Sequence, residues 1–284
     1  MTRTLLSFGH GYSARALARR LLPQGWRIVG TTRDAEKSRT IAASGVEPLI
    51  WPGEDVAEIL ERADALLISA APGDEGDPVL AEFADRIAAQ AHDFQWAGYL
   101  STTGVYGDHG GDWVDEGTAL APSTSRGQAR VEAEAAWREI PGLPLHIFRL
   151  AGIYGPGRGP FAKVRAGTAR RIVKPGQVFS RIHVEDIAQV LEASIARPNP
   201  GAVYNVCDDD PAPPQDVIAY AAQLLGLPMP PEQKFEAADM SAMARSFYAE
   251  SKKVRNDRIK EELGVSLLYP DYRSGLRALL DEEG

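Results

Sequence analysis

Short apolar, strand-like segments alternate with helix-like segments along the first two-thirds of this chain. The first pair is TLLSF (4–8) and YSARALARRLL (12–22). Further strand candidates lie at 26–33, 46–51, 64–72, 96–103 and 145–152, and helix candidates lie at 54–63, 78–93 and 126–139. Strict alternation of this kind predicts an α/β fold with parallel βαβ units in a doubly wound sheet. Such sheets bind ligands at the carboxyl ends of their strands.

The pattern loosens after residue 153. Glycine, proline and cations are frequent over 154–181, and two helix candidates follow at 214–226 and 251–264 with proline-rich joints. These features predict a smaller C-terminal lobe that closes over the carboxyl edge of the sheet. The chain has 284 residues, of which 44% are hydrophobic, and this is ample for one large domain or two closely joined ones.

Charge and cysteine content exclude several classes of protein. The net charge of -8 argues against a general affinity for nucleic acid, and no apolar run approaches the roughly 20 residues that span a bilayer. The N-terminal apolar run is too short for a secretory signal, so we expect a cytoplasmic protein. The single cysteine, Cys207, excludes an internal disulfide, and the five histidines lack metal-ligand spacing. We therefore expect no metal site.

A glycine-rich turn, FGHGYSA (8–14), follows the first strand candidate and opens the first helix candidate. Gly9, Gly11 and Ala14 fit the pattern G-x-G-x-x-G/A. In this pattern the first glycine permits a tight turn, the second lets the backbone approach a pyrophosphate, and the third small residue lets helix and strand pack closely. The helix N-terminus then faces the anion. The motif predicts dinucleotide binding, and a glycine turn between two packed elements is the alternative.

The end of the second strand candidate bears on the choice of nicotinamide cofactor. An acid there binds the ribose 2′-hydroxyl, whereas an arginine accommodates a 2′-phosphate. The segment GTTRDAEK places Thr32 and Arg33 at this position, and Asp34 follows one residue late, where it is also suited to cap the next helix. We therefore favour NADP over NAD. The alternative for Arg33 is an ordinary solvated cation.

Several segments in the right order resemble one family. They are YLSTTGVYGD (99–108), FRLAGIYGPGR (148–158), SRIHVEDIAQV (180–190), GAVYNVCDD (201–209) and LGVSLLYPDYRSGL (263–276). The chain resembles the extended short-chain dehydrogenase/reductases of the epimerase/dehydratase type. The resemblance implies a Rossmann dinucleotide-binding domain over 1–153, with 181–207 contributing at the lobe boundary, and a smaller substrate lobe over 154–284. Cofactor contacts are expected from Tyr12, Ser13, Ala71, Pro72 and Arg130, besides the residues named above.

The family's catalytic residues are a Ser or Thr and a Y-x-x-x-K pair. Thr102 occupies the Ser/Thr position. The segment SRGQARVEAE (125–134) aligns without a gap to the family pattern around the pair, and places Arg126 at the tyrosine and Arg130 at the lysine. Arg130 retains a cation for a ribose or phosphate. Arg126 keeps its proton at physiological pH, so it is a poor acid or base, although it binds carboxylates and phosphates well. The chain is therefore similar to the atypical subgroup that lacks the tyrosine.

Other residues are candidates for the missing proton carrier. Tyr106, Tyr154 and His109 are the first of these, whereas a structural hydrogen bond is the favoured role of His183. A basic run in this acidic chain predicts either a solvated face or a cationic wall for an anionic substrate such as a nucleotide-sugar; its members are Arg158, Lys163, Arg165, Arg170, Arg171 and Lys174.

Two hypotheses of function remain. One is an NADP-dependent oxidoreductase or epimerase-like enzyme that acts on an anionic small molecule with an altered acid/base group. The other is a non-catalytic NADP-binding sensor or regulator. The retained Thr102 and substrate-lobe motifs favour the enzyme. Family members usually form dimers through helices beside the active-site segment, so a homodimer through 130–140 is one expectation, and packing of its apolar side on the sheet is the other.

Overall fold

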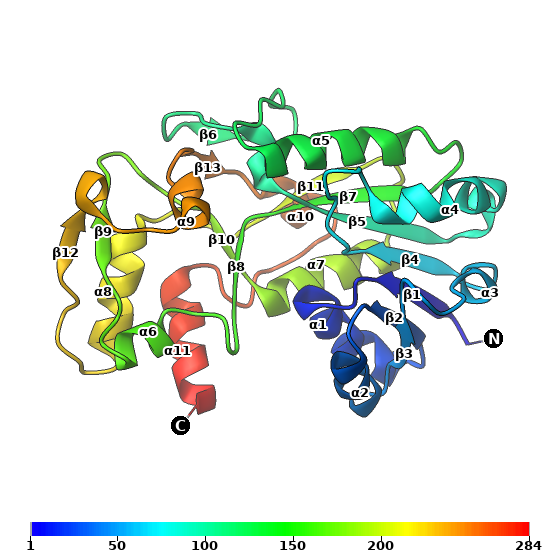
Figure 1. Ribbon diagram of the computed structural model, residues 1–284, viewed down its shortest axis with the longest axis horizontal. Coiled ribbons are helices and arrows are strands. Elements are labelled where there is room, and N and C mark those ends of the chain that lie inside the picture. Colours follow the sequence, from blue (N-terminus) through cyan, green and yellow to red (C-terminus); the bar gives the residue numbers. More distant parts are fainter. Residues whose placement is uncertain (1, 284) are drawn as a thin grey trace.

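The computed structural model describes residues 2–283 and is built around a parallel sheet (Figure 1). Within these residues seven strands have the order β11-β7-β5-β4-β1-β2-β3, and each neighbouring pair is parallel. Their bounds are β1 Thr4–Phe8, β2 Arg27–Thr32, β3 Glu47–Ile50, β4 Ala65–Ile68, β5 Trp96–Thr102, β7 Leu145–Leu150 and β11 Val203–Val206. The strand order reverses between β1 and β4, which is the doubly wound arrangement of a Rossmann fold.

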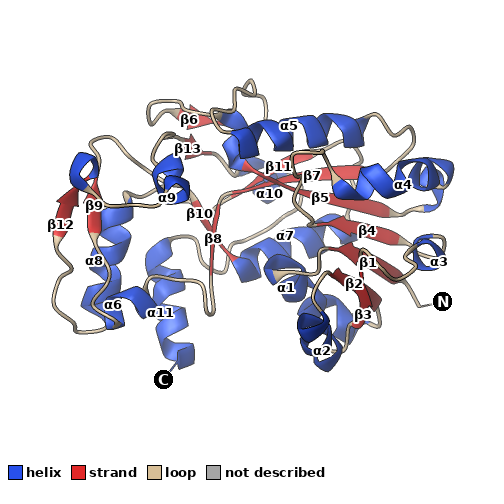
Figure 2. Ribbon diagram, viewed as in Figure 1, coloured by secondary structure: helices blue, strands red, loops and turns tan. Residues whose placement is uncertain are grey.

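Helices cover both faces of the sheet, and each face has its own hydrophobic core (Figure 2). On one face Leu17 and Val190 pack beneath the strands from helices α1 and α7, and on the other Phe83 and Trp137 pack from α4 and α5. The first face carries α1 Tyr12–Leu21, α2 Ala35–Ala43, α7 Val184–Ala196 and α10 Asp257–Glu261. The second carries α3 Ala57–Leu60, α4 Pro78–Ala89 and α5 Ser125–Arg138.

Side-chain caps fix where the helices on the sheet begin. Asp77 caps α4 by accepting bonds from the backbone N–H groups of the first turn, and Pro78 stands at the first helical position, where no N–H is needed. Thr124 caps α5 through a bond from Gly127 N at 3.1 Å. Ala133 and Trp137 on α5 are buried in the core against the sheet. The expectation that the apolar side of 130–140 packs on the sheet is therefore confirmed. A homodimer stays a prediction.

A smaller lobe lies beside the carboxyl edge of the sheet (Figure 1, left). Its core joins α6, α8 and α11 around buried side chains that include Phe161, Val217 and Leu276. The lobe and its junction contain β6 Trp113–Val114, β8 Gly152–Tyr154, α6 Phe161–Arg165, β9 Arg171–Val173, β10 Arg181–His183, α8 Pro214–Leu224, β12 Glu232–Lys234, α9 Ala242–Phe247, β13 Lys253–Val254 and α11 Tyr272–Glu283. The strands pair in parallel as β8 with β10, β9 with β12 and β6 with β13.

The predicted segment 4–8 coincides with β1, and the other strand candidates coincide with β2, β3, β4, β5 and β7 to within a few residues. The helix predicted over 251–264 is wrong in its first half, because Lys253 and Val254 form β13 and pair with β6. Only Asp257–Glu261 is helical there. Residues 181–207 supply α7 and β11, and β11 pairs with β7 in the main sheet. None of the described helices is long and apolar enough to cross a membrane.

Candidate active site

The glycine turn between β1 and α1 leaves a helix N-terminus without a side-chain cap. Gly9 has φ +73°, and a Cβ built on it would lie 2.8 Å from Ala70 N, so no other residue fits without strain. Gly11 is the N-cap of α1, and an added Cβ would meet nothing nearer than Gly9 O at 3.6 Å. The first turn of α1 carries no acid. The turn therefore offers free N–H groups and a positive dipole end to an anion.

The side chain of His10, within this turn, packs against β2. Its imidazole is buried and lies so close to the backbone of β2 that a Cβ on Gly30 would come within 2.6 Å of His10 Cγ. Burial lowers the pKa of His10 to about 4, so the ring is neutral at pH 7. Gly30 is therefore required by packing, which the sequence pattern of the glycine turn did not indicate.

At the end of β2, Arg33 has no partner within the described residues, whereas the neighbouring Asp34 caps the next helix. Asp34 Oδ1 accepts bonds from the backbone N–H groups of Glu36 and Lys37, which caps α2 and lowers the pKa of Asp34. Thr32 Oγ1 accepts a bond from Asp34 N at 3.2 Å. The Arg33 side chain is exposed and makes no hydrogen bond or ion pair within residues 2–283. Of the two roles considered for Asp34, capping is the one that the structure shows.

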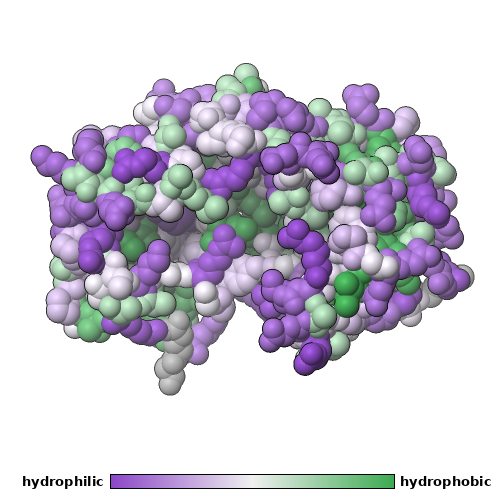
Figure 3. Space-filling view, in the orientation of Figure 1, coloured by the Kyte–Doolittle hydropathy of each residue, from purple (hydrophilic) through white to green (hydrophobic). Residues whose placement is uncertain are grey.

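A cleft of about 830 Å³ separates the carboxyl ends of the strands from the smaller lobe. Figure 3 shows the hollow between the two parts of the molecule. Of the predicted cofactor contacts, Ser13, Ala71, Pro72 and Arg130 line it. Ala14 is buried behind the glycine turn, where it packs in the core.

Tyr12 links the glycine turn to the start of the lobe. Its hydroxyl donates a bond to Pro156 O at 3.0 Å, and the Arg158 guanidinium lies over its ring at 5.8 Å. Arg158 also lines the cleft, so this cation stands next to the glycine turn.

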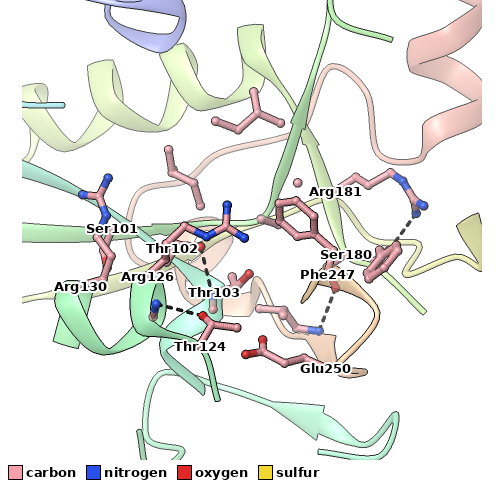
Figure 4. A pocket seen from close by; sticks show the side chains of 18 of the residues that line it. Ser101, Thr102, Thr103, Thr124, Arg126, Arg130, Ser180, Arg181, Phe247 and Glu250 are labelled. Carbon is pink, nitrogen blue, oxygen red and sulfur yellow. Dashed lines mark hydrogen bonds between the residues drawn. The ribbon is translucent and has the colours of Figure 1, made fainter. Parts of the chain in front are cut away.

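The three residues predicted to be catalytic all line the cleft, but they face different neighbours (Figure 4). Thr102 ends β5, and its Oγ1 accepts a bond from Gly104 N at 3.1 Å. Arg126 extends toward the lobe, where its Nη2 donates to Ser246 Oγ at 3.0 Å. Arg130 instead turns to the sheet and donates to Leu100 O at 2.6 Å and to Tyr99 Oη at 3.1 Å. The two guanidinium groups therefore have separate partners.

A buried ion pair holds α5 against the sheet behind these residues. Glu134 is fully buried and accepts bonds from Arg149 Nη2 at 2.8 Å and from Ser101 Oγ at 2.6 Å. Arg149 Nη1 in turn donates to Tyr106 Oη at 2.9 Å, and Tyr106 donates to Asn205 Oδ1 at 2.7 Å. Burial raises the pKa of Tyr106 to about 12. Tyr106 is therefore buried, lies outside the cleft lining and belongs to this hydrogen-bonded network.

The remaining candidates for a proton carrier are poorly placed. His109 lies outside the cleft lining, and its Nε2 is 3.1 Å from Tyr106 O. His183 Nδ1 accepts a bond from Glu185 N and caps α7, which is the structural role favoured from the sequence. Tyr154 does line the cleft, but burial, together with the charge of Asp208, raises its pKa far above the ordinary value. A phenol with a raised pKa is a weak acid at pH 7.

The described lining of the cleft is strongly cationic. Its charged side chains are Arg126, Arg130, Arg158, Arg181, Lys252 and one carboxylate, Glu250. Of the basic run over 158–174, Arg158 alone lines the cleft, and Lys174 instead donates to the carbonyl of Tyr248. Lys252 and Glu250 belong to no motif in the sequence, and Arg181 was not singled out within the segment 180–190. The excess of cations favours an anionic ligand.

Residues 8–207 match the family described as the NAD dependent epimerase/dehydratase family. The chain belongs to this family. The match begins at the end of β1 and ends just after β11, so it spans the glycine turn, Thr102, α5 and every strand of the central sheet that follows β1.

Three relatives show how far the similarity extends. The chain is 31% identical over 278 residues to Protein YeeZ of Escherichia coli K12, covering 93% of this chain and 95% of YeeZ. It is 26% identical to the 3-diazoavenalumate denitrifying reductase of Streptomyces sp, covering 94% and 91%. A solved structure from Silicibacter pomeroyi DSS, described as a functionally unknown conserved protein, is 66% identical, with a TM-score of 0.96 and 99% of each chain covered.

Proposed function

We propose that this family member is an NADP(H)-dependent oxidoreductase that acts on a small anionic molecule. The observation that favours NADP is Arg33, which has no partner within the described residues at the end of β2. The neighbouring Asp34 caps α2. The residues fit such a cofactor, because the uncapped turn at Gly11 suits a pyrophosphate and Arg33 suits a 2′-phosphate. When bound, the nicotinamide supplies or accepts a hydride.

The cleft residues bind and orient the substrate in this proposal. Thr102 Oγ1 already accepts a bond from Gly104 N, so its hydroxyl proton is free for donation to a substrate oxygen. Arg126 binds an anionic group and moves no proton. Of the relatives, the Streptomyces protein is named a reductase, which supports an enzymatic function. The substrate carbon that accepts the hydride is then one whose reduction does not require a proton from residue 126.

A non-catalytic NADP-binding sensor is the second candidate. The observation that favours it is the position of the alternative proton carriers, since Tyr106 and His109 lie outside the cleft lining. The intact cleft beside Thr102 favours the enzyme.

Calorimetric titration with NADPH and NADH tests the cofactor site in wild type and in Gly11→Val. Gly11 has φ -97° and ψ -151°, at the border of the extended region, and a Cβ on it would meet nothing nearer than Gly9 O at 3.6 Å, so we expect the variant to fold. Its side chain should occupy the space of the pyrophosphate and abolish binding. Failure of the wild type to bind either cofactor would overturn the proposal.

A further inference from the structure

The lobe end of the cleft is lined by aromatic rings. Phe179, Phe247 and Tyr248 belong to this lining, and Phe179 and Tyr248 pack edge to face at 5.5 Å. Phe247 remains 56% exposed, so much of its ring surface is open to a ligand. A flat apolar group bound here would cover this exposed ring surface and gain from ring packing.

Arg126 stands over one of these rings. Its guanidinium lies 4.9 Å from the centroid of Phe247, and no carboxylate lies within 4.0 Å of it in the described chain. Among the described residues the Arg126 guanidinium donates one hydrogen bond, from Nη2 to Ser246 Oγ, and its other N–H groups remain for a ligand. A planar guanidinium with free N–H groups is suited to a carboxylate, which it binds through two parallel bonds.

Three of the other cations in the described lining have hydrogen-bond or ion-pair partners, and the fourth, Arg158, lies at the sheet end of the cleft. Arg130 bonds the sheet, and Lys252 pairs with Glu250 Oε2 at 2.6 Å. Arg181 donates through Nη1 to Phe179 O and Ala212 O, and Arg158 lies over Tyr12 beside the glycine turn. At the lobe end Arg126 is therefore the cation left for a ligand, and one cation matches one negative charge.

The size of the cleft agrees with a small ligand. Its volume of about 830 Å³ lies within the usual range of roughly 300–1,000 Å³ for one small-molecule site. Under the proposed function the sheet side of the same cleft, near Ser13 and Ala71, also takes part of the dinucleotide. The remaining space and the one cation at the lobe end that has no ion-pair partner in the described chain suit a one-ring monoanion better than a sugar joined to a nucleoside diphosphate.

We propose that the lobe end of the cleft is a subsite for a small aromatic carboxylate, with the carboxylate on Arg126 and the ring against Phe247 and Phe179. This inference rests on the proposed function, since it names the substrate class of the same site. It makes Arg126, at the position of the family's tyrosine, a substrate-binding residue.

Ligand-observed NMR titrations test the subsite with and without saturating NADP⁺. The probes are trans-cinnamate, its neutral analogue cinnamyl alcohol, the aliphatic acid hexanoate, and UDP-glucose. We expect trans-cinnamate to bind at least tenfold more tightly than each of the other three. Arg126→Gln should weaken trans-cinnamate at least tenfold and leave cinnamyl alcohol nearly unchanged, whereas Phe247→Ala should weaken both aromatic probes and Phe247→Leu should weaken them less.

Matched controls lie on exposed positions away from the lining. Met229→Ala removes an exposed apolar side chain of the lobe that lies outside the lining, and Arg62→Gln removes an exposed cation from the surface after α3; neither should change the affinity. Equal affinity for trans-cinnamate and hexanoate, tighter binding of UDP-glucose, or insensitivity to Arg126→Gln would overturn the subsite. NADPH binding measured without acid reports the proposed function separately, so each can fail alone.

Discussion

Replacing Arg33 by alanine should separate the two nicotinamide cofactors. Arg33 makes no internal hydrogen bond or ion pair in the described residues, so the substitution should leave the folding free energy unchanged. A charge-assisted contact to a phosphate contributes about 1.5–3 kcal/mol. Because Arg33 is exposed and solvent screens its charge, we expect the lower end of this range. A loss of about 1.5 kcal/mol weakens NADPH roughly tenfold, and NADH should be almost unaffected.

Calorimetric titration of both cofactors measures this difference. Arg39→Ala is the matched control, because Arg39 is an exposed arginine on α2 without a described partner and lies away from the end of β2. Raising the salt concentration should narrow the gap between NADPH and NADH in wild type, since an exposed charge pair is screened. Equal losses for the two cofactors in Arg33→Ala, or the same loss in Arg39→Ala, would refute the role of Arg33.

Two further predictions concern the core behind the cleft. Glu134→Gln leaves the buried Arg149 guanidinium without its counter-charge, so the free energy of unfolding in urea should fall by about 3–5 kcal/mol; a loss below about 1 kcal/mol would contradict the importance of this pair. Burial lowers the pKa of His146 to about 4, so between pH 6.5 and 4 the unfolded chain binds a proton that the folded protein does not, and stability falls as the pH is lowered. His146→Gln should therefore reduce the slope of stability against pH in this window by up to about 1.4 kcal/mol per unit, and identical slopes would show that the imidazole is not held neutral.

The sequence predicted the parts of the fold that depend on local patterns. The run TLLSF carries no charged residue because both faces of β1 are covered, and it coincides with the strand. The strand β11 was not among the candidates, since its four residues Val203–Val206 are identified by pairing with β7 rather than by periodicity. Lys253 and Val254 read as part of a helix, because their partner strand β6 lies about 140 residues earlier in the chain.

Only some residues of the candidate site could likewise be predicted from the sequence. The glycine turn follows β1 and Thr102 ends β5, so their place at the carboxyl edge could be predicted from the alternation of elements. The opposite wall could not, because Phe247 and Lys252 belong to no motif and reach the cleft only through the packing of the lobe. The divergence of Arg126 and Arg130 also needed the structure, since four-residue spacing places both on one helical face but does not fix where long side chains turn.

The most direct measurement of the proposed function is NADPH turnover in wild type and in Arg126→Ala. The panel contains aldehydes, ketones, nucleotide-sugars and aromatic carboxylates with a reducible group. We expect no ordinary ketone or secondary-alcohol activity, because no group of suitable pKa stands at the position of Arg126. We expect turnover of an aromatic carboxylate, with KM raised at least tenfold and kcat little changed in Arg126→Ala. Robust turnover with unchanged kcat and KM in Arg126→Ala would show that Arg126 does not bind the substrate and would contradict the proposal.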